Sequence, residues 1–139
     1  MIASDPVVYM SKYQRTVALS SAEAGYMALS LCTQKALWTR AVLKDMGREQ
    51  VGGTQIWEYN QGAVAFAKNA GYHARTKHVD IMYHFIWENV QKGLQKIDYI
   101  DTNIQLADTI TKALGTKIPK YLREATGIKT KPNIIKTQY

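Results

Sequence analysis

A long helix with a clearly marked start constrains this sequence more than any other feature. Ser20 stands three residues before Glu23, which is the spacing of a capping box, and this pattern predicts a helix that begins at about Ser21. Gly47 is expected to end the helix. One predicted stripe of the helix is apolar and a second line carries small residues for close packing. The stripe is Met27, Leu31, Trp38 and Val42, and the small residues are Ala24, Ala28, Cys32 and Ala36.

Strands and further helices are predicted on both sides of this helix. The β-branched and aromatic residues of 6–11 indicate a short strand before it. After it the sequence predicts a strand at 54–58, a short helix from Asn60, a helix at 78–92, a strand at 94–100 and a helix at 104–114 that Asn103 would cap. Residues 69–77 are expected to form a loop, and the segment beyond Gly127 a loose end. This order indicates the α/β class.

Size and composition set the broad class of the protein. A chain of 139 residues is long enough for one hydrophobic core and too short for two. Its 46% hydrophobic and 21% charged residues are typical of a globular protein. The sequence has no apolar run long enough to cross a membrane, and its start lacks the layout of a signal peptide. We therefore expect an intracellular protein, in the cytoplasm or nucleus, that is not secreted, with the single cysteine, Cys32, as a small core residue.

Positive charge is concentrated towards the C-terminal end of the sequence. From Lys112 onwards there are seven Lys or Arg residues and one Glu, which account for +6 of the total net charge of +7. A basic segment of this kind attracts polyanions, chiefly nucleic acid, through the release of counterions. A solvated tail that aids solubility has the same composition, so the charge alone leaves both interpretations open.

Three stretches of the sequence resemble one known family. They are RTVALSSAEAGYMALSLCTQKALW, IWEYNQGAVAFAKNAGYHARTKHVDIMYHFIWENV and IDYIDTNIQLADTITKAL. In this order, over about residues 7–128, the chain resembles the ribonuclease H domain of copia-type retrotransposon polyproteins, and the run HARTKHVDIMYHF is the most specific part. The resemblance implies a ribonuclease H-like mixed sheet flanked by helices over residues 1–128. Residues 129–139 are expected to form a basic, disordered tail, because their sequence has no periodicity.

The resemblance also implies a chemistry. Carboxylates of the family hold two magnesium ions around the attack of water on the RNA strand of an RNA-DNA hybrid. Glu23 of SSAEAGY matches the family's glutamate at the start of the first long helix, and Asp108 of QLADTITK matches the aspartate of the late helix. Tyr59 stands where the family has an aspartate, because this chain reads EYNQGA in place of EDNQGA, and Gly25 stands where the family usually has glutamate. The family's leading aspartate would lie upstream of Met1, so the fold is expected to lack the first two strands and to bind magnesium poorly.

Each of these residues has a plainer interpretation. Glu23 can simply cap its helix, and Asp108 can be a surface residue of a helix. Arg75 and Lys77 lie in a basic segment that can contact phosphate or remain solvated. The three histidines are spaced by five and six residues and do not share a helical face, so a histidine metal site is not expected. Core or sheet packing is expected for the aromatic residues Trp38, Trp57, Tyr83 and Trp87.

The sequence leads to one main hypothesis about function and two alternatives. The main hypothesis is an inactive remnant of a retrotransposon reverse transcriptase and ribonuclease H polyprotein, since the neutral phenol of Tyr59 cannot replace a carboxylate on magnesium. The first alternative is a non-catalytic module that reuses the fold to bind nucleic acid or another partner. The second is an active nuclease whose missing strands come from another polypeptide. No membrane partner is expected, and an uncovered sheet edge would favour self-association.

Overall fold

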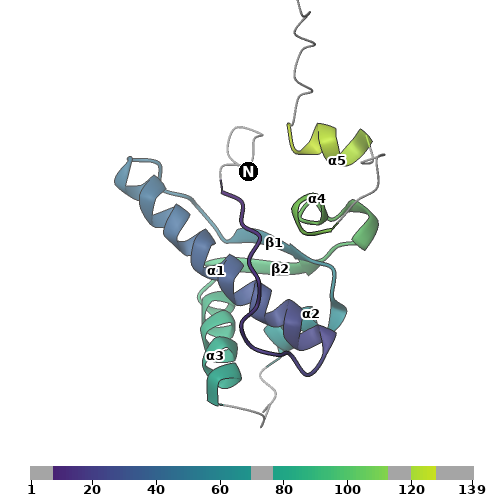
Figure 1. Ribbon diagram of the computed structural model, residues 1–139. Coiled ribbons are helices and arrows are strands. Elements are labelled where there is room, and N and C mark those ends of the chain that lie inside the picture. The colour runs from purple at the N-terminus through teal and green to yellow at the C-terminus, as the bar shows by residue number, and fades with distance from the viewer. Residues whose placement is uncertain (1–7, 70–76, 113–119, 128–139) are drawn as a thin grey trace, which may run out of the picture. The chain divides into compact units, whose positions relative to one another are not determined.

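The computed structural model describes residues 8–69, 77–112 and 120–127 (Figure 1). Its elements, in chain order, are α1 (Ser21–Asp45), β1 (Thr54–Glu58), α2 (Gln61–Lys68), α3 (Lys77–Gln91), β2 (Gln95–Tyr99), a 3-10 turn (Thr102–Ile104), α4 (Asp108–Thr111) and α5 (Lys120–Ala125). The chain divides into two compact units, one formed by Tyr13–Gln105 and the other by Met1–Lys12 together with Leu106–Tyr139. Within the described residues, no helix combines the length and the apolar character that crossing a membrane requires.

The start and end of α1 confirm the prediction from its capping box. The backbone N–H of Glu23 donates to Ser20 Oγ at 3.1 Å, and the N–H of Leu19 donates to Glu23 Oε2 at 2.6 Å. The first bond satisfies an N–H that the first turn of a helix leaves without an intrahelical partner, and the second ties the residue before the cap to the same turn. The helix ends at Asp45, and Gly47 follows with a φ of 72°, a left-handed conformation that glycine adopts without a steric cost.

The predicted buried stripe of α1 was wrong. The buried residues of this helix are Tyr26, Leu29, Ser30 and Thr33. Trp38 of the predicted stripe is 58% exposed, and Cys32 is exposed rather than a core residue. The buried face includes hydroxyl groups that bond across the core, since Thr33 Oγ1 donates to Gln95 Oε1 and the Tyr26 hydroxyl donates to the carbonyl of Tyr83. A pattern of apolar residues alone therefore could not identify it.

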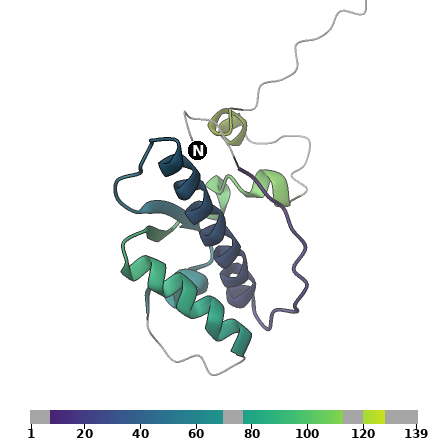
Figure 2. The same ribbon diagram turned by 90° about the vertical axis from the view of Figure 1, so that its left-hand side faces the viewer.

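β1 and β2 lie at the strands predicted at 54–58 and 94–100, and they pair with each other in parallel. The register pairs Thr54 with Gln95 and Ile56 with Ile97. Ile56 and Ile97 are buried in one hydrophobic core with residues of α1, α2 and α3, which contact one another and the strands (Figures 1 and 2). α2 and α3 match the helices predicted from Asn60 and at 78–92. The unit Tyr13–Gln105 is thus a mixed α/β arrangement with its core on one face of the sheet.

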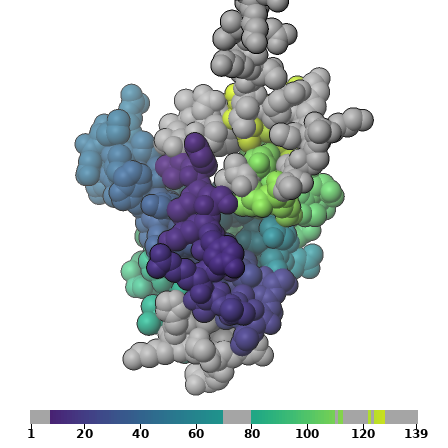
Figure 3. All heavy atoms as spheres, in the orientation of Figure 1, coloured from purple at the N-terminus to yellow at the C-terminus, as the bar shows by residue number. Residues whose placement is uncertain are grey.

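Residues 13–20 lead into α1 and lie on the face of the molecule that Figure 3 shows, among the dark purple spheres. Tyr13, Val17 and Leu19 are all exposed. Gln14 Nε2 donates to the carbonyl of Ala24 at 2.9 Å and ties the segment to the first turns of α1. Apolar side chains in this segment therefore face solvent in the described structure rather than enlarging the core.

Two predicted elements were wrong. Residues 8–11 of the strand predicted at 6–11 form no strand, because strand-forming residues also need a partner strand to bond with. In place of a helix over 104–114, the described residues form the 3-10 turn and then the short α4. Asp101 rather than Asn103 caps the turn, since the N–H of Asn103 donates to Asp101 Oδ1 at 2.8 Å. Such local side-chain bonds compete with helix formation. The short helix α5 was not predicted from the sequence.

Candidate functional site

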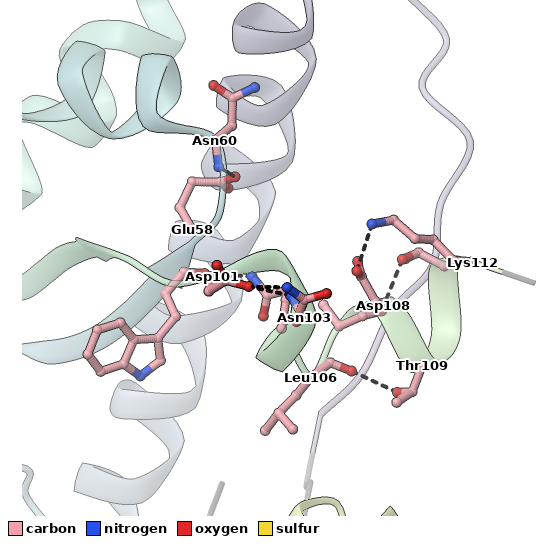
Figure 4. Close-up of polar contacts among 12 residues, drawn as sticks. Glu58, Asn60, Asp101, Asn103, Leu106, Asp108, Thr109 and Lys112 are labelled. Carbon is pink, nitrogen blue, oxygen red and sulfur yellow. Dashed lines mark hydrogen bonds and ion pairs between the residues drawn. The ribbon is translucent and has the colours of Figure 1, made fainter. Parts of the chain in front are cut away.

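The turn between β1 and α2 is built by two consecutive side-chain caps. Asn60 Oδ1 accepts a hydrogen bond from the N–H of Ala63 at 3.1 Å and so caps α2. Glu58 Oε1 accepts from the N–H of Asn60 at 2.8 Å (Figure 4). The end of β1 and the start of α2 are therefore fixed together, and this turn contains the position at which the resemblance places a metal ligand.

Glu58 is the best-defined carboxylate near this turn, and the sequence analysis did not single it out. Glu58 is only 9% exposed. Glu58 lies against α1, since a Cβ added at Gly25 would be in ordinary van der Waals contact with Glu58 Oε1 at 3.6 Å. Burial raises the pKa of Glu58, while hydrogen bonds from the N–H groups of Asn60 and Tyr59 oppose that rise. The signal available in the sequence was an acidic residue two positions after Ile56, at an inward position of the predicted strand.

Tyr59 lies next to Glu58 in sequence but in a different environment. Tyr59 is 44% exposed, whereas Glu58 is buried. Burial alternates along β1 in the same way, with Ile56 buried and Trp57 exposed, because successive side chains of a strand point to opposite faces. The carboxylate of Glu58 is therefore directed away from the side on which the tyrosine lies, and it does not take the place of an aspartate at position 59.

Glu23 has a structural partner of its own. Its carboxylate accepts the N–H of Leu19, and its own N–H donates to Ser20 Oγ. Glu23 thus takes part in capping its helix, although its carboxylate accepts from the N–H of Leu19 rather than from that of the N-cap residue Ser20 as a capping box would have it. One of its carboxylate oxygens is committed to the backbone.

Asp108 is the first residue of α4 and belongs to the other compact unit. It is 6% exposed, and its Oδ2 lies 2.6 Å from Nζ of Lys112, one turn further along the chain (Figure 4). The hydroxyl of Thr109 donates to the carbonyl of Leu106 at 2.7 Å and supports the same turn. A lysine ammonium already compensates the negative charge of this carboxylate.

The three carboxylates near the motifs of the resemblance each hold a partner of their own. Magnesium ions take carboxylate oxygens in a demanding octahedral geometry, and a two-metal site needs several such oxygens close together. Glu23 is bonded to the backbone, Glu58 is bonded at the β1–α2 turn, and Asp108 is paired with Lys112. Among the residues that the structure describes, no three His, Cys, Asp or Glu side chains converge as metal ligands would.

The remaining predicted residues are placed as follows. Arg75 lies outside the described residues, and only the backbone of Lys77, the first residue of α3, is described. Tyr83 is buried, as expected. Core or sheet packing was wrong for Trp38 and Trp57, which are 58% and 51% exposed. A tryptophan can alternate outwards on a strand as readily as inwards, so its size alone did not decide its environment.

Comparison with known proteins relates the chain to mobile genetic elements. It is 34% identical over 122 residues, 88% of its length, to the retrovirus-related Pol polyprotein from transposon TNT 1-94 of Nicotiana tabacum. It is 36% identical over 79% of its length to that from transposon RE1 of Arabidopsis thaliana, and 33% identical over 92% to that from transposon RE2 of the same plant. The matched region is only 8–9% of the length of these relatives. No protein-family model and no solved structure matches the chain. Over most of its length, the chain is therefore a homologue of the retrovirus-related Pol polyproteins of copia-type retrotransposons.

Proposed function

We propose that this chain is a catalytically inactive remnant of the ribonuclease H domain of a copia-type Pol polyprotein. The homology to Pol polyproteins over most of the chain supports a retrotransposon origin. The ribonuclease H assignment rests on the motifs around Glu23, Tyr59 and Asp108, which resemble those of that domain. The observed order of the long helix α1, strand β1, helices α2 and α3, and strand β2 is compatible with it. Under this proposal the protein acts, or once acted, inside the cell.

The observation that carries the proposed inactivity is the chemistry at the end of β1. Tyr59 carries a phenol where the family has a carboxylate, and magnesium prefers carboxylate oxygens, so this position offers the ion a poorer ligand. The adjacent carboxylate of Glu58 is buried and bonded to the N–H of Asn60. Glu23 and Asp108, the two residues that match family ligands, hold other partners. Poor magnesium binding follows from this donor set.

A cleavage assay tests this proposal. The purified chain is incubated with a labelled RNA-DNA hybrid and magnesium, and no cleavage is expected. Cleavage that Glu23→Gln abolishes would show that the site is active and would overturn the proposal. Tyr59→Asp alone is also expected to remain inactive, since it leaves Glu23 bonded to Leu19 and Asp108 bonded to Lys112. Groups that act as one catalytic unit do not contribute additively, so restoring one carboxylate is not expected to restore activity.

A second candidate is a non-catalytic module that binds nucleic acid. The observation that favours it is the exposed Trp57 on the sheet, in a chain with a net charge of +7. Binding of this kind weakens steeply as salt rises, because each phosphate contact releases counterions. A chain that shows no binding at low salt would exclude this candidate and leave the inactive remnant. Self-association through an uncovered sheet edge would appear as oligomers in sedimentation, and a monomer would count against it.

A further inference from the structure

The outer face of the β1–β2 sheet is the face opposite the core. It exposes side chains that have no part in the proposed loss of catalysis. Gln55 and Trp57 of β1 are exposed, and the register places Lys96 and Asp98 of β2 beside them. Tyr59, one residue beyond β1, continues the alternation and is exposed as well. Parallel sheets are usually covered on both faces, so two exposed aromatic side chains on one face indicate a binding surface.

The charges on this face favour an anionic ligand. Lys68 Nζ donates to Asp98 Oδ1 at 2.8 Å, and Gln55 Nε2 donates to Asp98 Oδ2 at 3.0 Å. The hydrogen bond from Lys68, then that from Gln55, and the charges of Lys68 and Lys96 hold the pKa of Asp98 below its ordinary value. Asp98 is therefore ionised and already compensated at neutral pH. Lys68 and Lys96 carry two positive charges against the single negative charge of Asp98, so these three residues together have a net positive charge.

We propose that Trp57 and Tyr59 stack the bases of single-stranded nucleic acid while Lys96 and Lys68 face its phosphates. This inference rests on the non-catalytic binding function above and names its ligand and surface. Tyr59 follows the end of β1, two residues after Trp57, and both side chains are exposed, so each ring can receive a base. A duplex hides the faces of its bases, so a stacking surface selects single strands.

Fluorescence anisotropy with a labelled oligothymidylate of about 10 nucleotides at low salt tests the proposal on the full chain. Trp57→Leu removes the ring and should weaken binding roughly 5- to 100-fold. Trp38→Leu is the matched control, because Trp38 is a similarly exposed tryptophan that lies on α1 next to Lys35. It should leave the affinity unchanged. An equal loss in both variants would overturn the assignment of the surface.

Further variants keep the test informative if Trp57→Leu does not fold. Trp57→Tyr keeps an aromatic ring, so binding should stay within about threefold while the quenching of tryptophan fluorescence by the oligonucleotide becomes smaller. Lys96→Thr should remove about one phosphate contact. The slope of log affinity against log salt concentration should therefore become smaller by about 1. A chain that does not bind the oligonucleotide at low salt, or whose salt dependence and quenching these changes leave untouched, would overturn the proposal.

Two outcomes separate this inference from the proposals before it. Binding of an RNA-DNA hybrid that Trp57→Leu does not weaken, without preference for single strands, would support a binding module and overturn this surface. A dimer in sedimentation that Trp57→Leu dissociates would show that a second copy of the chain occupies the face, which also overturns the proposal. The cleavage assay is independent of both, because it reports only on the catalytic site.

Discussion

The two faces of the β1–β2 sheet differ in what holds them in place. The inner face packs Ile56 and Ile97 into the core with α1, α2 and α3. The outer face presents Trp57 and Lys96 to solvent, although these residues are the immediate neighbours of the buried isoleucines. Residues of the inner face therefore stabilise the fold through their packing. Residues of the outer face are exposed, and under the proposal above they contact the ligand. Substitutions on the two faces should separate stability from binding.

Replacing Ile97 should give the largest loss of stability. This residue is 2% exposed and is paired with Ile56 in the register. Ile97→Ala removes buried methyl groups and leaves a cavity, so the free energy of unfolding should fall by about 2–5 kcal/mol, and Ile97→Val should cost about 0.5–1.5 kcal/mol. Urea denaturation followed by circular dichroism measures both. Equal and small effects of the two changes would mean that the inner face is not tightly packed.

The buried polar link between α1 and β2 should have the next largest effect. Thr33 Oγ1 donates to Gln95 Oε1 at 3.0 Å, and Gln95 Nε2 donates back to the carbonyl of Thr33 at 3.2 Å. Thr33→Val keeps the shape of the side chain but leaves a buried acceptor without its donor, which costs about 1–3 kcal/mol. Thr39→Val is the control on the same helix, because the Thr39 hydroxyl bonds only to the carbonyl of Lys35 in an exposed position. If both changes cost the same in urea denaturation, the buried bond does not stabilise the fold.

Local signals in the sequence identified most of the elements around the core. The start of α1 followed from Ser20 and Glu23, and α2 follows Asn60, because caps depend on residues within a few positions of one another. The end of α1 followed from Gly47, which has a positive φ. Such features need no knowledge of the rest of the chain.

Environments set by distant residues could not be predicted in the same way. Thr33 is buried because Gln95, 62 positions away, completes its hydrogen bonds. Glu58 is buried against α1, near Gly25, a residue 33 positions earlier in the chain. The candidate site was hidden for the same reason, since the motifs indicated which residue types were present but not which partners they held. The pairing of Asp108 with Lys112 is the exception, because a spacing of four residues is visible in the sequence.

Glu58 allows a prediction about pH. Burial raises its pKa above the ordinary value of 4.5, so the folded chain binds this proton more tightly than the unfolded chain. The ionised carboxylate therefore costs stability, and the cost appears as the pH rises through and above 4.5. Glu58→Gln removes the charge and keeps an acceptor for the N–H of Asn60. Its melting temperature should exceed that of the unchanged chain at neutral pH, and the difference should shrink in acid.

Glu49→Gln is the control for this measurement, because Glu49 forms an exposed ion pair with Lys44. It should show no gain in melting temperature at neutral pH, since an exposed carboxylate carries little burial cost. If Glu58→Gln lowers the melting temperature at neutral pH, the carboxylate contributes more through its backbone hydrogen bonds than it loses through burial. In that case Glu58 is a stabilising cap of the β1–α2 turn.

The smallest effect on stability is expected from Lys96, the outward neighbour of Ile97. Its side chain is exposed, and threonine has a high preference for strands, so Lys96→Thr should change the free energy of unfolding by about 0.5 kcal/mol or less. The same change removes a positive charge next to Trp57 and Asp98, so it should weaken the binding of a single-stranded oligonucleotide mainly at low salt. Urea denaturation and anisotropy on one preparation measure both quantities. A large loss of stability would show that the outer face is also part of the core, and it would remove the difference between the two faces on which the binding surface depends.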